Sequence, residues 1–125
     1  MVVGIGTDIV EIARIADVLD RQGDAFVQRI LTLSEQKQYQ ASKQKAAFLA
    51  KRFAAKEAVA KALGTGIGSG VSFQDMTISN DGKGAPSVSL SAGAAHIAAE
   101  RSAQKVLLSI ADEQKYAIAY AMLSD

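Results

Sequence analysis

Residues 43–64 read KQKAAFLAKRFAAKEAVAKALG and form the longest helical pattern in the chain. Alanine, lysine and leucine dominate the stretch, and all three are strong helix formers. The glycine at position 64 predicts the C-terminal end, because glycine readily adopts the left-handed conformation that terminates many helices. We therefore expect one long helix over residues 43–63, with the rest of the fold arranged around it.

One face of this helix mixes apolar and charged side chains. At about 100° per residue, an apolar arc comprises Phe48, Leu49, Phe53, Val59, Ala60 and Leu63. Arg52 and Lys56 fall inside the arc, so each either lays its stem across apolar surface or meets a buried anion. Glu57 and Lys61 lie one turn apart at its edge. They form either a plain helix salt bridge or part of a phosphate-and-metal site, which this clustering of four charges favours.

A strand precedes this helix in the chain. Residues 2–10 alternate and are rich in β-branched side chains, which predicts a strand. Because successive side chains point to opposite faces, Gly4, Gly6 and Asp8 share one face. We expect that face to leave space for a bulky ligand, with Asp8 as the partner of Glu57. The alternative is that Asp8 caps the helix that directly follows the strand.

The remaining elements predict an α+β fold within a single domain, residues 1–125. Further helices are expected over residues 11–22, 24–31, 34–41 (with Ser34 as N-cap) and 91–102 (with Ser91 as N-cap). Further strands are expected over residues 71–79, 87–90, 105–111 and 115–123. The last strand alternates large side chains with alanines, so we expect both of its faces to be covered.

Composition excludes several classes of protein. The chain has 125 residues, a net charge of +1, no cysteine and one histidine. These counts exclude a disulfide scaffold, a thiolate zinc site and a cysteine nucleophile. No apolar run reaches the roughly 18 residues of a membrane span, and no signal peptide is apparent, so we expect a cytoplasmic protein. The near-neutral total indicates no general affinity for nucleic acid.

Charge distribution and the missing ligand types together point to a phosphate-bearing ligand. Between residues 36 and 62, seven basic residues face a single acid. This indicates a localised anionic ligand, or alternatively a solvated lysine-rich helix. A divalent ion would need oxygen ligands, which suits Mg²⁺ held by Asp8 and Glu57. With Lys61 these side chains would form an electrostatic clamp for phosphoryl chemistry. The glycine runs match neither a dinucleotide fingerprint nor a P-loop.

Two motifs carry a resemblance to a known family. Residues 4–12 read GIGTDIVEI, and residues 48–58 read FLAKRFAAKEA, followed by KALGTGIG over residues 61–68. In these motifs the chain resembles the holo-acyl-carrier-protein synthases, the small bacterial class of 4′-phosphopantetheinyl transferases. One departure is that many members carry histidines where this chain has Leu107 and Asp112.

The resemblance implies a reaction and a fold. Such enzymes transfer the 4′-phosphopantetheine arm of coenzyme A to a serine of apo-acyl carrier protein, releasing adenosine 3′,5′-bisphosphate. Their fold is an antiparallel sheet packed with one long and several short helices. It assembles as a homotrimer with active sites between subunits. The alternatives are a non-catalytic module that binds coenzyme A or a nucleotide, and a structural oligomerisation domain.

The resemblance also implies roles for individual residues. Asp8 and Glu57 would ligate Mg²⁺, and Glu57 or a metal-bound water would accept the serine proton. Lys61 would neutralise charge on the transferring phosphoryl group. The nucleotide would be held by Arg52, Lys56, Lys61, Gly64, Thr65 and Gly66.

A docking face for the carrier is expected on the first helix. Arg14 and Arg21 lie seven residues apart and share a face that suits an acidic carrier protein. The alternative is two solvated arginines.

Overall fold

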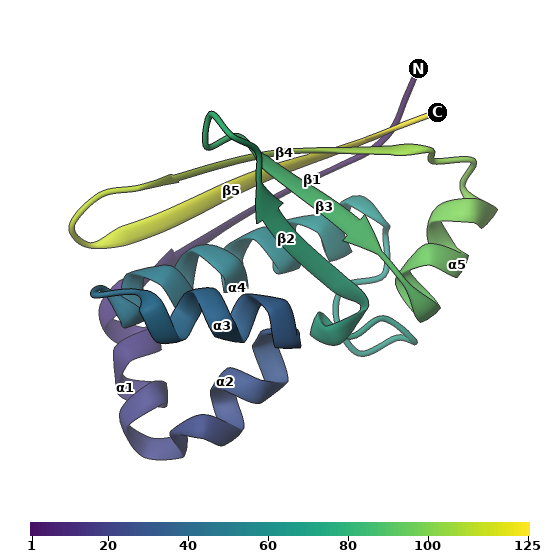
Figure 1. Cartoon of the computed structure of the whole chain (residues 1–125). Coiled ribbons are helices and arrows are strands. Elements are labelled where there is room, and N and C mark those ends of the chain that lie inside the picture. Colours follow the sequence, from purple (N-terminus) through teal and green to yellow (C-terminus); the bar gives the residue numbers. More distant parts are fainter.

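The computed structural model describes all 125 residues, and Figure 1 shows strands β1, β4 and β5 laid across the long helix α4. The strands are β1 (Val2–Glu11), β2 (Met76–Asn80), β3 (Pro86–Leu90), β4 (Lys105–Asp112) and β5 (Tyr116–Ser124). The helices are α1 (Ile12–Gln22), α2 (Asp24–Ile30), α3 (Leu33–Ala41), α4 (Lys45–Ala62) and α5 (Ala92–Glu100). All strand pairs are antiparallel, which confirms the predicted α+β class.

The three-stranded sheet has the order β1-β5-β4, and one of its faces packs on α4. On β5 this face carries Ala117, Ala119 and Ala121, all of which are buried. Small side chains are required there because the helix backbone lies close to the strand. A separate two-stranded sheet pairs β2 with β3.

The glycine face of β1 packs directly against α4. A Cβ on Gly6 would overlap the carbonyl oxygen of Ala58, and a Cβ on Gly4 would overlap that of Ala62. Glycine at both positions therefore allows main chain to contact main chain. The expectation that this face leaves space for a ligand was wrong, because the helix occupies that space.

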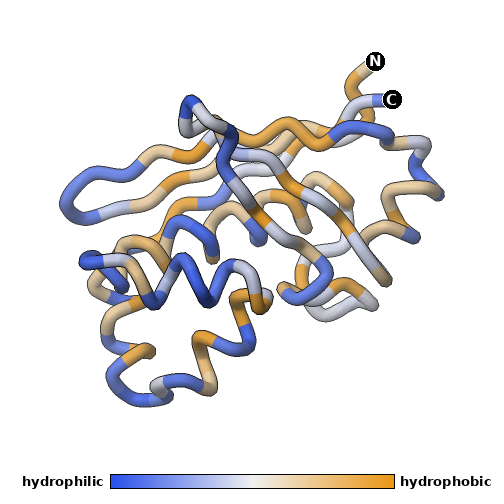
Figure 2. Tube along the Cα trace, in the orientation of Figure 1, coloured by the Kyte–Doolittle hydropathy of each residue, from blue (hydrophilic) through white to orange (hydrophobic).

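The other face of the sheet is apolar and has no cover from this chain. Its exposed side chains are Ile5, Ile9, Leu107, Tyr116, Ile118 and Tyr120. Figure 2 shows hydrophobic stretches along these strands, whereas α3 and the β4–β5 turn are hydrophilic. Within one chain, then, only the alanine face of the last strand is covered.

Two local predictions were wrong: the N-cap of α3 and the start of the strand expected over residues 71–79. In both places a side-chain cap sets the boundary. Helix α3 has Thr32 rather than Ser34 as its N-cap, since Glu35 at the third helical position accepts the Thr32 N–H at 2.8 Å. The chain forms a 3₁₀ turn over Phe73–Asp75 before β2 begins.

Asp75 accounts for that turn and also caps α5. Its carboxylate accepts bonds from the N–H groups of Ser72 and, at the start of α5, Ala94. Ser91 is the N-cap residue of that helix, as predicted, but its side chain makes no cap bond to it. No helix in the structure combines the length and hydropathy that crossing a bilayer requires.

Candidate active site

Asp8, Glu57 and Lys61 converge where β1 crosses α4. The Lys61 Nζ donates to Asp8 Oδ1 at 3.0 Å and to the Thr7 carbonyl at 3.0 Å. The Lys61 side chain remains 50% exposed and that of Asp8 16% exposed. Lys61 thus pairs across to the strand, and its partner is not Glu57 on the same helix. Asp8 makes this ion pair and does not cap α1, whose N-cap is Glu11.

Glu57 lies one helical turn before Lys61 on α4, and the charges of both Asp8 and Lys61 act on its carboxylate. Burial raises the pKa of Glu57 above its usual value, and the negative charge of Asp8 raises it further. The positive charges of Lys61 and Arg29 act in the opposite direction. Since a divalent cation between Asp8 and Glu57 would relieve both the repulsion and the desolvation, the pair fits a hard metal ion.

The donor set also restricts which metal fits. No group of three or more histidine, cysteine or acidic side chains is gathered anywhere in the structure. A bound ion would therefore take two carboxylates and complete its coordination with water or substrate oxygens, which is the usual habit of Mg²⁺.

The glycine-rich segment follows Lys61 directly and closes the end of α4. The N–H of Gly64 donates to the Lys61 carbonyl, and the N–H groups of Thr65 and Gly66 both donate to the Ala60 carbonyl. These three amides are therefore already satisfied within the chain. Gly66 has open space where a Cβ would lie, so a ligand can approach the backbone there.

Arg101 donates hydrogen bonds that hold this segment in place, a role that no sequence pattern indicated. Its Nη1 donates to the Leu63 carbonyl at 2.8 Å, and its Nη2 donates to the Val3 carbonyl at 2.7 Å. One side chain therefore joins the C-terminal end of α4 to β1. Contacts over such sequence separations leave no local periodic signal.

Lys56 lies in the interior, away from any ligand surface. Its side chain is fully buried, and its Nζ donates to the Ile30 carbonyl at 2.6 Å, Glu35 Oε1 at 2.6 Å and the Phe73 carbonyl at 3.1 Å. An ammonium group has three N–H donors, and all three are used here. The structure thus leaves Lys56 no donor for a nucleotide, although the family resemblance assigned it one.

Glu35 is a further buried charge that the sequence predictions did not include. The Thr32-x-x-Glu35 spacing is a capping-box signal, which marks Glu35 as part of the first turn of a helix. That signal does not indicate that Glu35 is fully buried and ion-paired.

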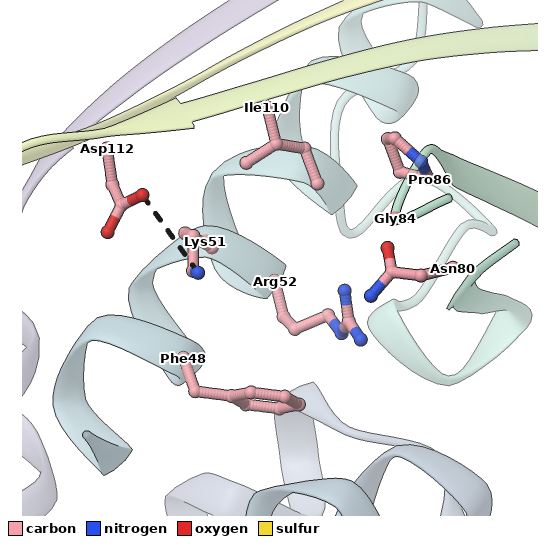
Figure 3. A pocket seen from close by; sticks show the side chains of 8 residues that line it. All are labelled: Phe48, Lys51, Arg52, Asn80, Gly84, Pro86, Ile110 and Asp112. Atoms are coloured by element: carbon pink, nitrogen blue, oxygen red, sulfur yellow. Dashed lines mark ion pairs between the residues drawn. The ribbon is translucent and has the colours of Figure 1, made fainter. Parts of the chain in front are cut away.

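Arg52 lines a separate pocket of about 210 Å³ (Figure 3). The lining residues are Phe48, Lys51, Arg52, Asn80, Gly84, Pro86, Ile110 and Asp112. The Arg52 guanidinium lies over the Phe48 ring, 4.7 Å from its centroid. Lys51 Nζ lies 4.0 Å from Asp112 Oδ1, so the pocket carries two cations and one acid.

The structure brings some predicted site residues together and separates others. Arg52 and Lys61 are nine residues apart on α4, which places them about 14 Å apart along the axis and on opposite sides. Arg14 and Arg21 are both exposed on α1. One chain thus presents a carboxylate–lysine cluster, a cationic pocket and an arginine-bearing helix as distinct features.

Comparison with known proteins identifies the family. A sequence model of the 4′-phosphopantetheinyl transferase superfamily matches residues 4–121. The chain belongs to this superfamily. A holo-acyl-carrier-protein synthase of Vibrio cholerae is 54% identical over 123 residues, which cover 98% of this chain and 98% of that relative. The resemblance drawn from the two sequence motifs is therefore confirmed.

Solved structures of the superfamily agree with the fold. The holo-acyl-carrier-protein synthase of Neisseria meningitidis matches with a TM-score of 0.93 and 39% identity, covering 100% of both chains. The synthase of Bacillus anthracis in complex with CoA (3′,5′-ADP) matches with a TM-score of 0.83 and 41% identity, covering 98% of this chain and 96% of that chain.

Proposed function

We propose that this chain, acting as one transferase domain over residues 1–125, transfers the 4′-phosphopantetheine arm of coenzyme A to a serine of apo-acyl carrier protein. Adenosine 3′,5′-bisphosphate is the second product. The observation that carries the proposal is the convergence of Asp8, Glu57 and Lys61. It occurs in a chain that is 54% identical to a holo-acyl-carrier-protein synthase.

Asp8 and Glu57 are the proposed ligands of Mg²⁺. When bound, the metal neutralises charge on the pyrophosphate of coenzyme A. Glu57, or a water held by that metal, is the proposed acceptor of the serine proton.

Lys61 acts on the transferring phosphoryl group. Its half-exposed ammonium is held in place by Asp8 and the Thr7 carbonyl, and it retains a third N–H for a phosphate oxygen. The partner protein brings the nucleophile, so catalysis here consists of positioning and electrostatic stabilisation.

The nucleotide portion of coenzyme A is assigned to the pocket beside Arg52. Arg52 and Lys51 supply positive charge for phosphate, and Phe48 and Ile110 supply apolar surface for a base. Gly64, Thr65 and Gly66 lie beyond the C-terminal end of α4, next to Lys61, and they are assigned to ligand contacts on that side of the site. A ligand can approach the backbone at Gly66, whereas Arg101 fills the space beside Gly64.

A homotrimer would complete the site. Arg52 and Lys61 face opposite ways on α4, so a ligand that needs both must draw them from two copies. Asp112 lines the nucleotide pocket and also a neighbouring apolar hollow with Ile9 and Ile118. The exposed apolar face therefore adjoins the pocket, and a second copy covering that face would supply its missing wall.

The carrier protein is assigned to α1, where Arg14 and Arg21 are exposed. Acyl carrier proteins are acidic, and opposite charges steer such encounters.

The test is intact-mass analysis of apo-acyl carrier protein after incubation with this chain, coenzyme A and Mg²⁺. The wild type should add one phosphopantetheine to the carrier. The Asp8→Asn variant should keep the wild-type fold but leave the carrier at its apo mass. Glu100→Gln removes an exposed carboxylate paired only with His96 and serves as the matched control. A wild type that binds coenzyme A but never modifies the carrier would support a binding module and reject the transferase.

A further inference from the structure

Three charged side chains meet in the interior beside the nucleotide pocket. Glu35 and Lys56 are fully buried, and Arg52 is 5% exposed. The cluster therefore holds two cations and one anion. Buried charges are normally paired, so one positive charge lacks a counter-charge within the chain.

The contacts of Glu35 show which cation it neutralises. Its Oε1 accepts from Lys56 Nζ at 2.6 Å, and also from the N–H and hydroxyl of Thr32 at 2.8 Å and 3.1 Å. Its Oε2 accepts from the Ile78 N–H at 2.9 Å. Lys56 and neutral donors from Thr32 and Ile78 thus occupy most of the hydrogen-bond acceptor sites of the Glu35 carboxylate.

Arg52 is left without a full partner. Its Nε lies 3.7 Å from Glu35 Oε2, which exceeds hydrogen-bond distance, and this buried Nε has no hydrogen-bond partner at all. Its Nη2 donates to Gln38 Oε1 at 2.8 Å, and its guanidinium lies over Phe48. Neutral groups therefore orient the guanidinium where it lines the pocket (Figure 3).

We propose that Lys56 is a positioning residue that, by pairing with Glu35 at hydrogen-bond distance, keeps that carboxylate from fully neutralising Arg52, which lies farther from it. The excess positive charge of Arg52 is then available to an anionic phosphate in the pocket. The inference rests on the proposed function, since it requires the pocket to bind the nucleotide. Lys56 contributes to affinity without touching the ligand.

The test is calorimetric binding of coenzyme A and of adenosine 3′,5′-bisphosphate to three variants. Lys56→Met keeps the side-chain volume but frees Glu35 to pair with Arg52, so the Kd should rise about tenfold, the usual weight of a hydrogen bond to a charged group. The double variant Glu35→Gln/Lys56→Met removes the competing carboxylate as well. Its Kd should return to within about threefold of the wild type.

Lys45→Met is the matched control. Lys45 also lies on α4, and its ammonium donates to the carbonyls of Tyr39, Gln40 and Ser42. Its loss removes as many hydrogen bonds as the loss of Lys56 does, three in each case, without touching the cluster, so the Kd should not change.

The outcomes separate this inference from the proposed function. If the wild type binds neither ligand, the nucleotide pocket and the inference are both wrong. If it binds, but Lys56→Met keeps the wild-type Kd, or the double variant is as weak as the single, the inference alone is wrong.

A measurement on the wild type covers the case in which Lys56→Met does not fold. The Arg52 Nε–H resonance, assigned by its loss in Arg52→Lys, should shift saturably as adenosine 3′,5′-bisphosphate is added. A resonance that stays in place at saturation would also overturn the inference.

Discussion

Helix α4 makes two carboxylate–lysine pairs that differ in their surroundings. Glu35 and Lys56 meet at 2.6 Å with no exposure of either side chain, whereas Asp8 and Lys61 meet at 3.0 Å with 16% and 50% exposure. Every N–H of Lys56 has a protein acceptor, but Lys61 keeps one for a ligand. Residue type is the same in both pairs, so burial and the number of satisfied donors decide which pair holds the fold and which is available for chemistry.

The largest effect expected from this contrast is on stability. Glu35→Ala should lower the free energy of unfolding by about 3–5 kcal/mol, because it leaves buried Lys56 without a counter-charge. Asp8→Ala should lower it by about 1 kcal/mol or less, because Lys61 can turn to solvent. Urea denaturation of both variants measures this difference, and equal losses would remove the distinction between the pairs.

The second prediction concerns activity, for which the exposed Asp8–Lys61 pair should matter more than the buried Glu35–Lys56 pair. Lys61→Ala should reduce transfer to the carrier protein by about 10²–10³-fold, as expected when a donor that stabilises the transition state is removed. Its unfolding midpoint should stay close to that of the wild type. The exposed Lys43 offers the control Lys43→Ala, which should be fully active. An inactive Lys43→Ala would mean that overall positive charge, and not the position of Lys61, matters.

The smallest effect expected is a gain in stability when Glu57, beside the exposed Asp8–Lys61 pair, loses its charge. Because the pKa of Glu57 is raised in the folded chain, the native state binds more protons than the unfolded state between the ordinary and the raised pKa. The metal-free protein therefore loses stability as the pH rises through that interval. Glu57→Gln should abolish this loss and raise the unfolding midpoint at neutral pH while inactivating the enzyme. Thermal melts across the pH range, without metal, measure it, and a lower midpoint for the variant would contradict the prediction.

The elements of the fold followed from sequence because their signals are local. Alternation gave β1, β4 and β5, and Gly64 marked the end of the long helix. The errors came where one side chain caps another segment, as Asp75 does for both the 3₁₀ turn and α5. Hydrophobic periodicity does not register a cap between residues three apart, such as Ser72 and Asp75, and the bond from the Ala94 N–H to Asp75 joins residues 19 apart in the sequence.

The site could be predicted only in part for the same reason. Helical spacing placed Glu57 beside Lys61, and alternation along the first strand singled out Asp8 as its partner, a choice that the family resemblance supported. The helical arc correctly placed Lys56 on a buried face and left open whether it meets an anion there. Only the structure shows that the anion is Glu35, which comes from another helix. That partner changes Lys56 from an expected ligand contact into an interior group.

The contact between Gly6 and the Ala58 carbonyl has a consequence for sequence divergence. Because two main chains touch there, the spacing between Asp8 on β1 and Glu57 on α4 does not depend on how the core side chains pack. Core residues can be exchanged for others of similar volume with little effect on that spacing. Any side chain at position 6, however, must push β1 away from α4 and carry Asp8 with it. The separation of the two proposed metal ligands is therefore fixed by a residue that has no side chain.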